Sequence, residues 1–180
     1  MPLQISQFSE PVRAILAGIH RQPFPLVQTK PDEDASGTLE GRSAADLFPS
    51  SRYPQEALSG LFLRLNHWEK SHQLSQELNT AEGSYWHGIA HRLEPDYGNA
   101  GYWFRRTGQH PIFPQLLAAA GDALGAQPTS WSLGQQWDPF LFNRWCEEAI
   151  RGRDEAKLAA ATAIQQAEWE LLFEWCGARV

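Results

Sequence analysis

Apolar residues recur at helical spacing along most of the chain, and the clearest run lies between positions 82 and 107. At 100° per residue, one arc of a helix collects Tyr85, Trp86, Ile89, Ala90 and Leu93. Pro95 and the Asp-Tyr-Gly-Asn turn at 96–99 end that helix. A second helix then places Ala100, Trp103, Phe104 and Thr107 on one face. The pattern predicts a helical hairpin.

The same period predicts helices on both sides of this hairpin. Thr80 and Asp138 are expected N-caps, and Pro139 suits the first helical position after Asp138. No run alternates between apolar and polar residues as a half-buried strand does. The sequence therefore predicts an all-α fold, with further helices over 54–66, 68–78, 114–124, 139–151 and 154–176 and a short amphipathic segment at 12–19.

The first part of the chain has a composition that is typical of loops rather than helices. Between positions 23 and 50, several prolines, an acidic run at 32–34 and a Ser-Gly pair are typical of loops, with one short turn expected around 44–48. We predict a long irregular N-terminal arm (1–53) packed on a single helical domain (1–180), the alternative being a disordered tail. Two helical hairpins (54–111) and C-terminal helices (112–180) complete that domain. The expected anchors of the arm are Phe24, Leu26, Leu47 and Phe48.

The two hairpins resemble each other. Residues 57–65 (ALSGLFLRL) align with 85–93 (YWHGIAHRL), so that Gly60 matches Gly88, and after one extra residue in the turn 68–75 align with 97–104. Matched glycines suggest that helices approach closely there. The pattern resembles tetratricopeptide-like helix pairs in a degenerate form, although any two amphipathic helices share a period. His87 and His91 align with a serine and a leucine, so the repeat itself does not call for histidine.

Composition narrows the classes of partner. The net charge of −6 and the pI near 5.5 argue against nucleic acid, which needs a basic surface. No apolar run reaches the roughly 20 residues that span a membrane, and the N-terminus lacks the pattern of a signal peptide. Two cysteines do not form a disulfide framework. These features predict a cytoplasmic protein with neither a nucleic-acid nor a membrane partner.

One candidate chemistry is metal binding. His87 and His91, at positions i and i+4, place two imidazoles on one side of a helix, and Glu94 at i+7 can add a carboxylate. Gly88 stands where metalloproteases carry their catalytic glutamate. A transition metal such as zinc, iron or manganese, in a metal-dependent enzyme, is one interpretation. Histidines bound only to water or core groups are the alternative.

A second candidate is a groove that binds a small polar or anionic ligand, or a peptide. Arginine side chains match carboxylates and phosphates and stack on aromatic rings. The aromatic pair Tyr102 and Trp103 is flanked by three arginines, Arg92, Arg105 and Arg106. Arg92 could instead pair with Glu94 or Asp96. An interaction scaffold without chemistry, or a purely structural network, is the remaining alternative. The residues expected in the groove are His87, His91, Asp96, Asn99, Tyr102 and Arg106.

The residues of this region also resemble a known pattern. Residues 82–106 (EGSYWHGIAHRLEPDYGNAGYWFRR), followed by His-Pro at 110–111, resemble a family of uncharacterised bacterial and fungal proteins. Its signature is Trp-His, His-Arg, Glu-x-Asp, Asn-Ala and Tyr-Trp-Phe-Arg in this order. The resemblance covers roughly 57–117. It implies no particular activity, but it implies that the cluster is the hallmark of the family and favours a binding or catalytic role.

Overall fold

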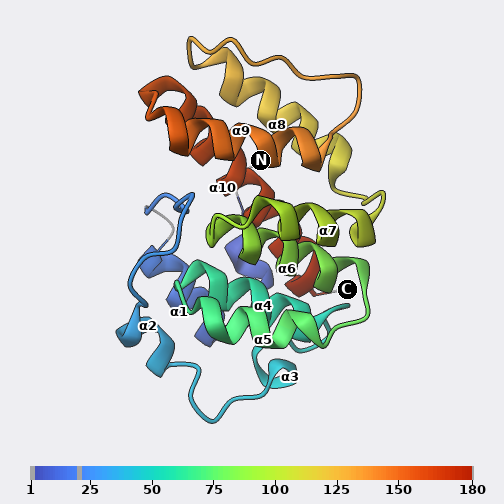
Figure 1. The fold of residues 1–180 in the computed structure, drawn as a ribbon. Coiled ribbons are helices and arrows are strands. Elements are labelled where there is room, and N and C mark those ends of the chain that lie inside the picture. The colour runs from blue at the N-terminus through green and yellow to red at the C-terminus, as the bar shows by residue number, and fades with distance from the viewer. Residues whose placement is uncertain (1–2, 20–21, 180) are drawn as a thin grey trace.

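The computed structural model describes residues 3–19 and 22–179, and the chain in these ranges is built of helices (Figure 1). The prediction of an all-α fold is confirmed. The β contact that the structure records in this part of the chain is one isolated bridge, between Ser51 and Arg179. The helices are η1 (Ile5–Gln7), α1 (Glu10–Ile19), α2 (Glu33–Gly37), α3 (Ala44–Leu47), α4 (Pro54–Arg64), α5 (Trp68–Gln76), α6 (Ala81–Leu93), α7 (Tyr97–Thr107), α8 (Phe113–Gly125), α9 (Pro139–Gly152) and α10 (Glu155–Gly177).

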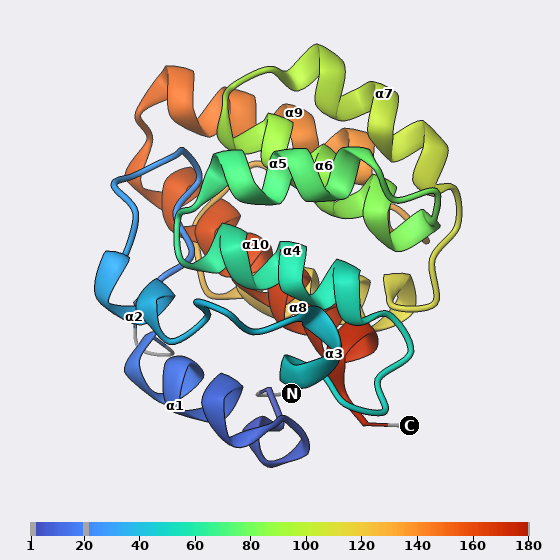
Figure 2. The ribbon, with the colours of Figure 1, turned by 90° about the horizontal axis from the view of Figure 1, so that it is seen from below.

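The last helix, α10, runs through the middle of the molecule and packs against α4, α8 and α9 (Figure 2). Asp154 begins it by accepting a hydrogen bond from Lys157 N at 3.0 Å. Its apolar residues are spread around the helix rather than along one stripe, as expected of a helix with neighbours on several sides. Trp169 stacks on Phe173 at 4.6 Å between ring centroids. No helix in the described ranges is both long enough and apolar enough to cross a membrane.

Side-chain caps fix the ends of the helices that carry the candidate residues. Thr80 accepts a hydrogen bond from Gly83 N at 3.0 Å and begins α6, as predicted. Asp96 accepts one from Asn99 N at 3.1 Å and begins α7. The segment 96–99, predicted to be a turn, is therefore the cap and first turn of α7. The prediction was wrong because it counted Asp96 only as a turn residue and not as an N-cap.

The matched glycines do lie where helices approach closely. A Cβ atom on Gly60 would lie 2.5 Å from the Trp86 ring, and one on Gly88 would lie 2.6 Å from the Phe104 ring. The contacts are not equivalent, however. Gly60 of α4 faces α6 in the next hairpin, whereas Gly88 of α6 faces α7 in its own hairpin. The tetratricopeptide-like repeat therefore stays a prediction.

The N-terminal arm is tied to the helices by backbone hydrogen bonds. Gln28 N donates to Leu93 O at 3.0 Å, and Asp32 N donates to Leu65 O at 2.9 Å. Helix α3 forms where a turn was expected, behind a capping box at Ser43. Helix α2 was not predicted. The four expected anchors are all buried: Phe24, Leu26, Leu47 and Phe48.

Candidate metal centre

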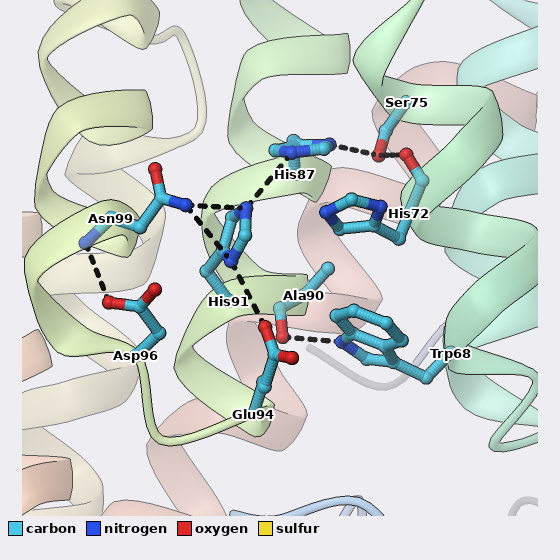
Figure 3. A network of polar contacts seen from close by, with 9 residues as sticks. All are labelled: Trp68, His72, Ser75, His87, Ala90, His91, Glu94, Asp96 and Asn99. Atoms are coloured by element: carbon cyan, nitrogen blue, oxygen red, sulfur yellow. Dashed lines mark hydrogen bonds and ion pairs between the residues drawn. The ribbon is translucent and has the colours of Figure 1, made fainter.

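Three histidine side chains converge between two helices. His72 comes from α5, and His87 and His91 come from α6 (Figure 3). One ring nitrogen from each lies within 4.8 Å of the others. His87 and His91 are buried, with 1% and 6% of their surface exposed, and His72 is half-buried. Three imidazoles at this distance are a recognised donor set for a transition metal.

Residues of α5 place His72 against α6. The indole Nε1 of Trp68 donates to Ala90 O at 2.7 Å and so joins the two helices. The Trp68 ring stacks on His72, four residues later, with 4.6 Å between centroids and an interplanar angle of 27°. Ser75 lies on the same face of α5, and its hydroxyl reaches His87. The His87 ring lies on α6, 4.4 Å from the His72 ring between centroids, so His72 packs against both Trp68 and His87.

The hydroxyl of Ser75 determines which nitrogen of His87 carries the hydrogen. Ser75 Oγ lies 2.7 Å from Ser71 O, to which it donates its only hydrogen. It can then only accept from His87 Nδ1, at 2.9 Å. We therefore assign the hydrogen of His87 to Nδ1, which leaves a lone pair on Nε2.

A carboxylate fixes His91 in the same way. Nδ1 of His91 lies 3.3 Å from Glu94 Oε2, and an ionised carboxylate only accepts. Nε2 of His91 therefore also carries a lone pair. The two Nε2 atoms, of His87 and His91, are 3.0 Å apart. Two neutral imidazoles in these tautomers have no hydrogen to share, so two Nε2 acceptors meet at this distance, and the one on His91 also accepts from Asn99 Nδ2.

Burial and neighbouring histidines disfavour protonation of the pair. Burial, followed by the charges of His72 and His91, lowers the pKa of His87 to about 3. Burial and His72 also lower the pKa of His91, against the opposing effect of Glu94 and Asp96. At neutral pH both imidazoles are therefore neutral, and a proton does not bridge them.

The metal-free protein should become less stable as the pH falls from 7 to 5. Because the folded-state pKa of His87 lies below its unfolded value of 6.5, the unfolded state binds the proton first, and stability is lost from about pH 6.5 towards pH 3. We expect a loss of about 1–2 kcal/mol over this interval, after a discount for partial solvent screening. Urea unfolding in the presence of a chelator measures it.

The matched control for this measurement is His87→Gln, which cannot take up the proton and keeps a partner for Ser75. Its free energy of unfolding should depend less steeply on pH between 5 and 7. Equal slopes in the two proteins would show that His87 is not the group responsible.

The structure brings some of the predicted site residues together. Asn99 Nδ2 lies 3.1 Å from His91 Nε2, and Glu94 contacts His91. Glu94 sits at Nδ1, on the edge of the ring away from the Nε2 pair. Asp96 serves as the cap of α7. Of the predicted ligand residues, Tyr102 is 47% exposed and touches the Trp103 ring rather than a histidine.

Other predicted residues lie elsewhere. Arg92 pairs with Glu168, not with Glu94 or Asp96, and both partners are fully buried. Arg106 lies over the Trp103 ring, 5.2 Å from its centroid. Trp103 was expected on one face of its helix with Ala100 and Phe104, but unlike these two buried residues it is half-buried, and it packs on His87 at 4.1 Å between centroids.

His72 and Ser75 were missed by the sequence reasoning. The signal was present, because Trp68, Ser71, His72 and Ser75 follow one face of α5 at i, i+3, i+4 and i+7. Helix α5 was expected to form a hairpin with α4, but nothing in the sequence pattern showed that the face of α5 with His72 would lie against α6.

No protein-family model, curated protein sequence or solved structure matches the chain.

Proposed function

We propose that this protein binds one transition-metal ion, of the class of Zn²⁺, through His72, His87 and His91. The observation that carries the proposal is the 3.0 Å distance between Nε2 of His87 and Nε2 of His91, neither of which carries a hydrogen in the assigned tautomers. A cation between them turns a repulsive contact into two coordination bonds. The third nitrogen, from His72, stands within 4.8 Å of both.

The distances suit such an ion after a small adjustment. At metal–nitrogen distances of about 2.0–2.1 Å, tetrahedral geometry separates two nitrogen ligands by about 3.3–3.4 Å. The His87–His91 pair would open by a few tenths of an ångström, and His72, on the neighbouring helix, would move inward. Imidazole donors suit zinc, cobalt, nickel, copper and iron more than calcium or magnesium.

The surroundings of the histidines also support a metal. Metal-binding histidines usually donate their second ring N–H to an oxygen atom, which fixes the tautomer. Ser75 does this for His87, and Glu94 does it for His91. We therefore assign Glu94 the role of orienting His91 rather than that of a ligand. Three protein ligands leave a position open, as in catalytic zinc sites, which keeps a metal-dependent enzyme as the alternative.

The cysteines of the chain take no part in this site. Cys146 and Cys176 are free and buried, and burial raises the pKa of the Cys146 thiol to about 12. Neither thiol is therefore ionised at neutral pH, although a thiolate is the form that binds metal. Two free thiols also agree with the reducing cytoplasmic setting that we propose.

Cobalt provides the test, because Co²⁺ replaces Zn²⁺ with visible absorption that reports coordination number. Untagged protein, stripped with a chelator, should take up one Co²⁺ per chain, with the intense bands of a four-coordinate ion. One equivalent of Zn²⁺ should then displace it. Uptake below one equivalent, or bands of a six-coordinate ion only, would overturn the proposal.

A further inference from the structure

The proposed metal would have protein ligands from α5 and α6 only, while α7 borders the site on the side away from α5 (Figure 3). Asn99, Trp103 and Arg106 occupy positions i, i+4 and i+7 of α7 and so share one face. We infer that the fourth coordination position takes a small oxyanion, a carboxylate or a phosphate, which Asn99 and Arg106 hold from α7. This inference rests on the proposed metal site.

Asn99 supplies a hydrogen-bond donor at the required place. Its Nδ2 atom lies 3.1 Å from Nε2 of His91 and 3.4 Å from Nδ1. Asn99 now donates a hydrogen bond to the lone pair on Nε2 of His91. A metal ion bound to Nε2 would occupy that lone pair. The amide N–H groups are then left beside the metal without that partner. An oxygen atom bound to the metal gives them a new acceptor.

Arg106 supplies a positive charge on the same face. Its guanidinium is exposed and lies over the Trp103 ring, and that ring packs on His87, so Trp103 links Arg106 to the histidines. In the part of the chain that the structure describes, no carboxylate forms an ion pair with Arg106. A guanidinium fork matches the two oxygens of a carboxylate or phosphate.

The charges around the site favour an anion over a neutral ligand. Three neutral imidazoles leave the full double charge on the metal. The carboxylates of Glu94, which accepts from His91, and of Asp96, which caps α7, offset part of this charge, and Arg106 adds one positive charge. A monodentate or bridging oxyanion compensates the remaining positive charge of the metal and Arg106 together. The positive charge of the metal and Arg106 is a local feature of a chain whose net charge is −6.

The experiment uses the cobalt-loaded protein, titrated separately with inorganic phosphate and with acetate while the visible bands are followed. We expect at least one anion to shift the bands in a saturable manner. The anion with the lower dissociation constant identifies the ligand class. Arg106→Gln should weaken that anion about tenfold, the size expected for one charge-assisted hydrogen bond. Its affinity for Co²⁺ should stay within twofold of the parent.

Arg105→Gln is the matched control, because Arg105 and Arg106 are both exposed on α7 but Arg105 points to a different face. It should leave the anion affinity unchanged. Bands that respond to neither anion, or equal losses in the two variants, would overturn the inference while the metal site stands. Failure of Co²⁺ to bind at all is a separate result, because it removes the proposed function before any anion is added.

Discussion

Replacing His72 with alanine should weaken zinc binding about a hundred- to a thousandfold. Structural zinc sites contribute about 10–16 kcal/mol of apparent binding free energy, so one of three or four ligands supplies about 3–4 kcal/mol. His72 is the best ligand to remove, because it is half-buried and its loss opens no cavity in the core. Competition with a chromophoric chelator, at fixed pH, measures the dissociation constant.

Two further variants show whether His72 acts as a ligand. Glu94→Gln keeps the shape of the side chain but weakens the acceptor for His91, and should cost only about 10–100-fold in affinity, as other orienting partners do. Gln73→Ala changes the exposed neighbour of His72 on α5 and should have no effect beyond twofold. A smaller loss for His72→Ala than for Glu94→Gln would mean that the metal is held without His72.

The helices could be predicted because their signals are local. Capping residues and prolines marked several ends, and the starts of α6 and α9 at Thr80 and Asp138 agree with the structure. The same local reasoning failed at Asp96, where one side chain suits both a turn and an N-cap. Helix α2 has only five residues, too few for a periodic pattern to show.

The candidate site could be predicted only where it lies within one helix. His87 and His91 face the same way because of their spacing, and this is visible in the sequence. Their contact with His72 depends on how α5 is rotated against α6, which the Trp68–Ala90 hydrogen bond and the packing of whole surfaces decide. The tautomers depend in turn on Ser75, which lies twelve positions before His87.

The ion-pair partner of Arg92 also lies far from it in the sequence. Its neighbours in sequence offered Glu94 and Asp96, but the side chain faces the core, and its partner Glu168 lies 76 positions away. Local charge pattern cannot distinguish an arginine that faces a ligand from one that faces a buried carboxylate. The direction of the side chain follows from its contacts with Gln165 and Glu168 of α10 and with the Phe142 ring of α9.

Breaking this ion pair should be the most damaging single charge change in the core. Arg92 and Glu168 are fully buried, and the guanidinium also donates to Gln165 Oε1 at 3.0 Å and lies 4.7 Å from the Phe142 ring centroid. Burial alone would lower the pKa of Arg92, but the attraction of Glu168 outweighs it and the pKa is raised. Because a guanidinium keeps its proton in proteins even without a counter-charge, the charge stays when Glu168 is replaced.

We accordingly expect Glu168→Gln to cost about 3–5 kcal/mol, because it leaves Arg92 buried without a counter-charge. The glutamine still offers an oxygen to Tyr85 Oη, which donates to Glu168 at 2.9 Å, so the loss reports the charge and not that hydrogen bond. Adding Arg92→Met to this variant removes the unpaired charge and should recover at least about 2 kcal/mol. Denaturant unfolding at pH 7, with equal m-values, gives the three free energies. A double variant less stable than Glu168→Gln alone would contradict this account, and would show that Arg92 stabilises the core by its packing on Phe142 and its bond to Gln165 more than by its charge.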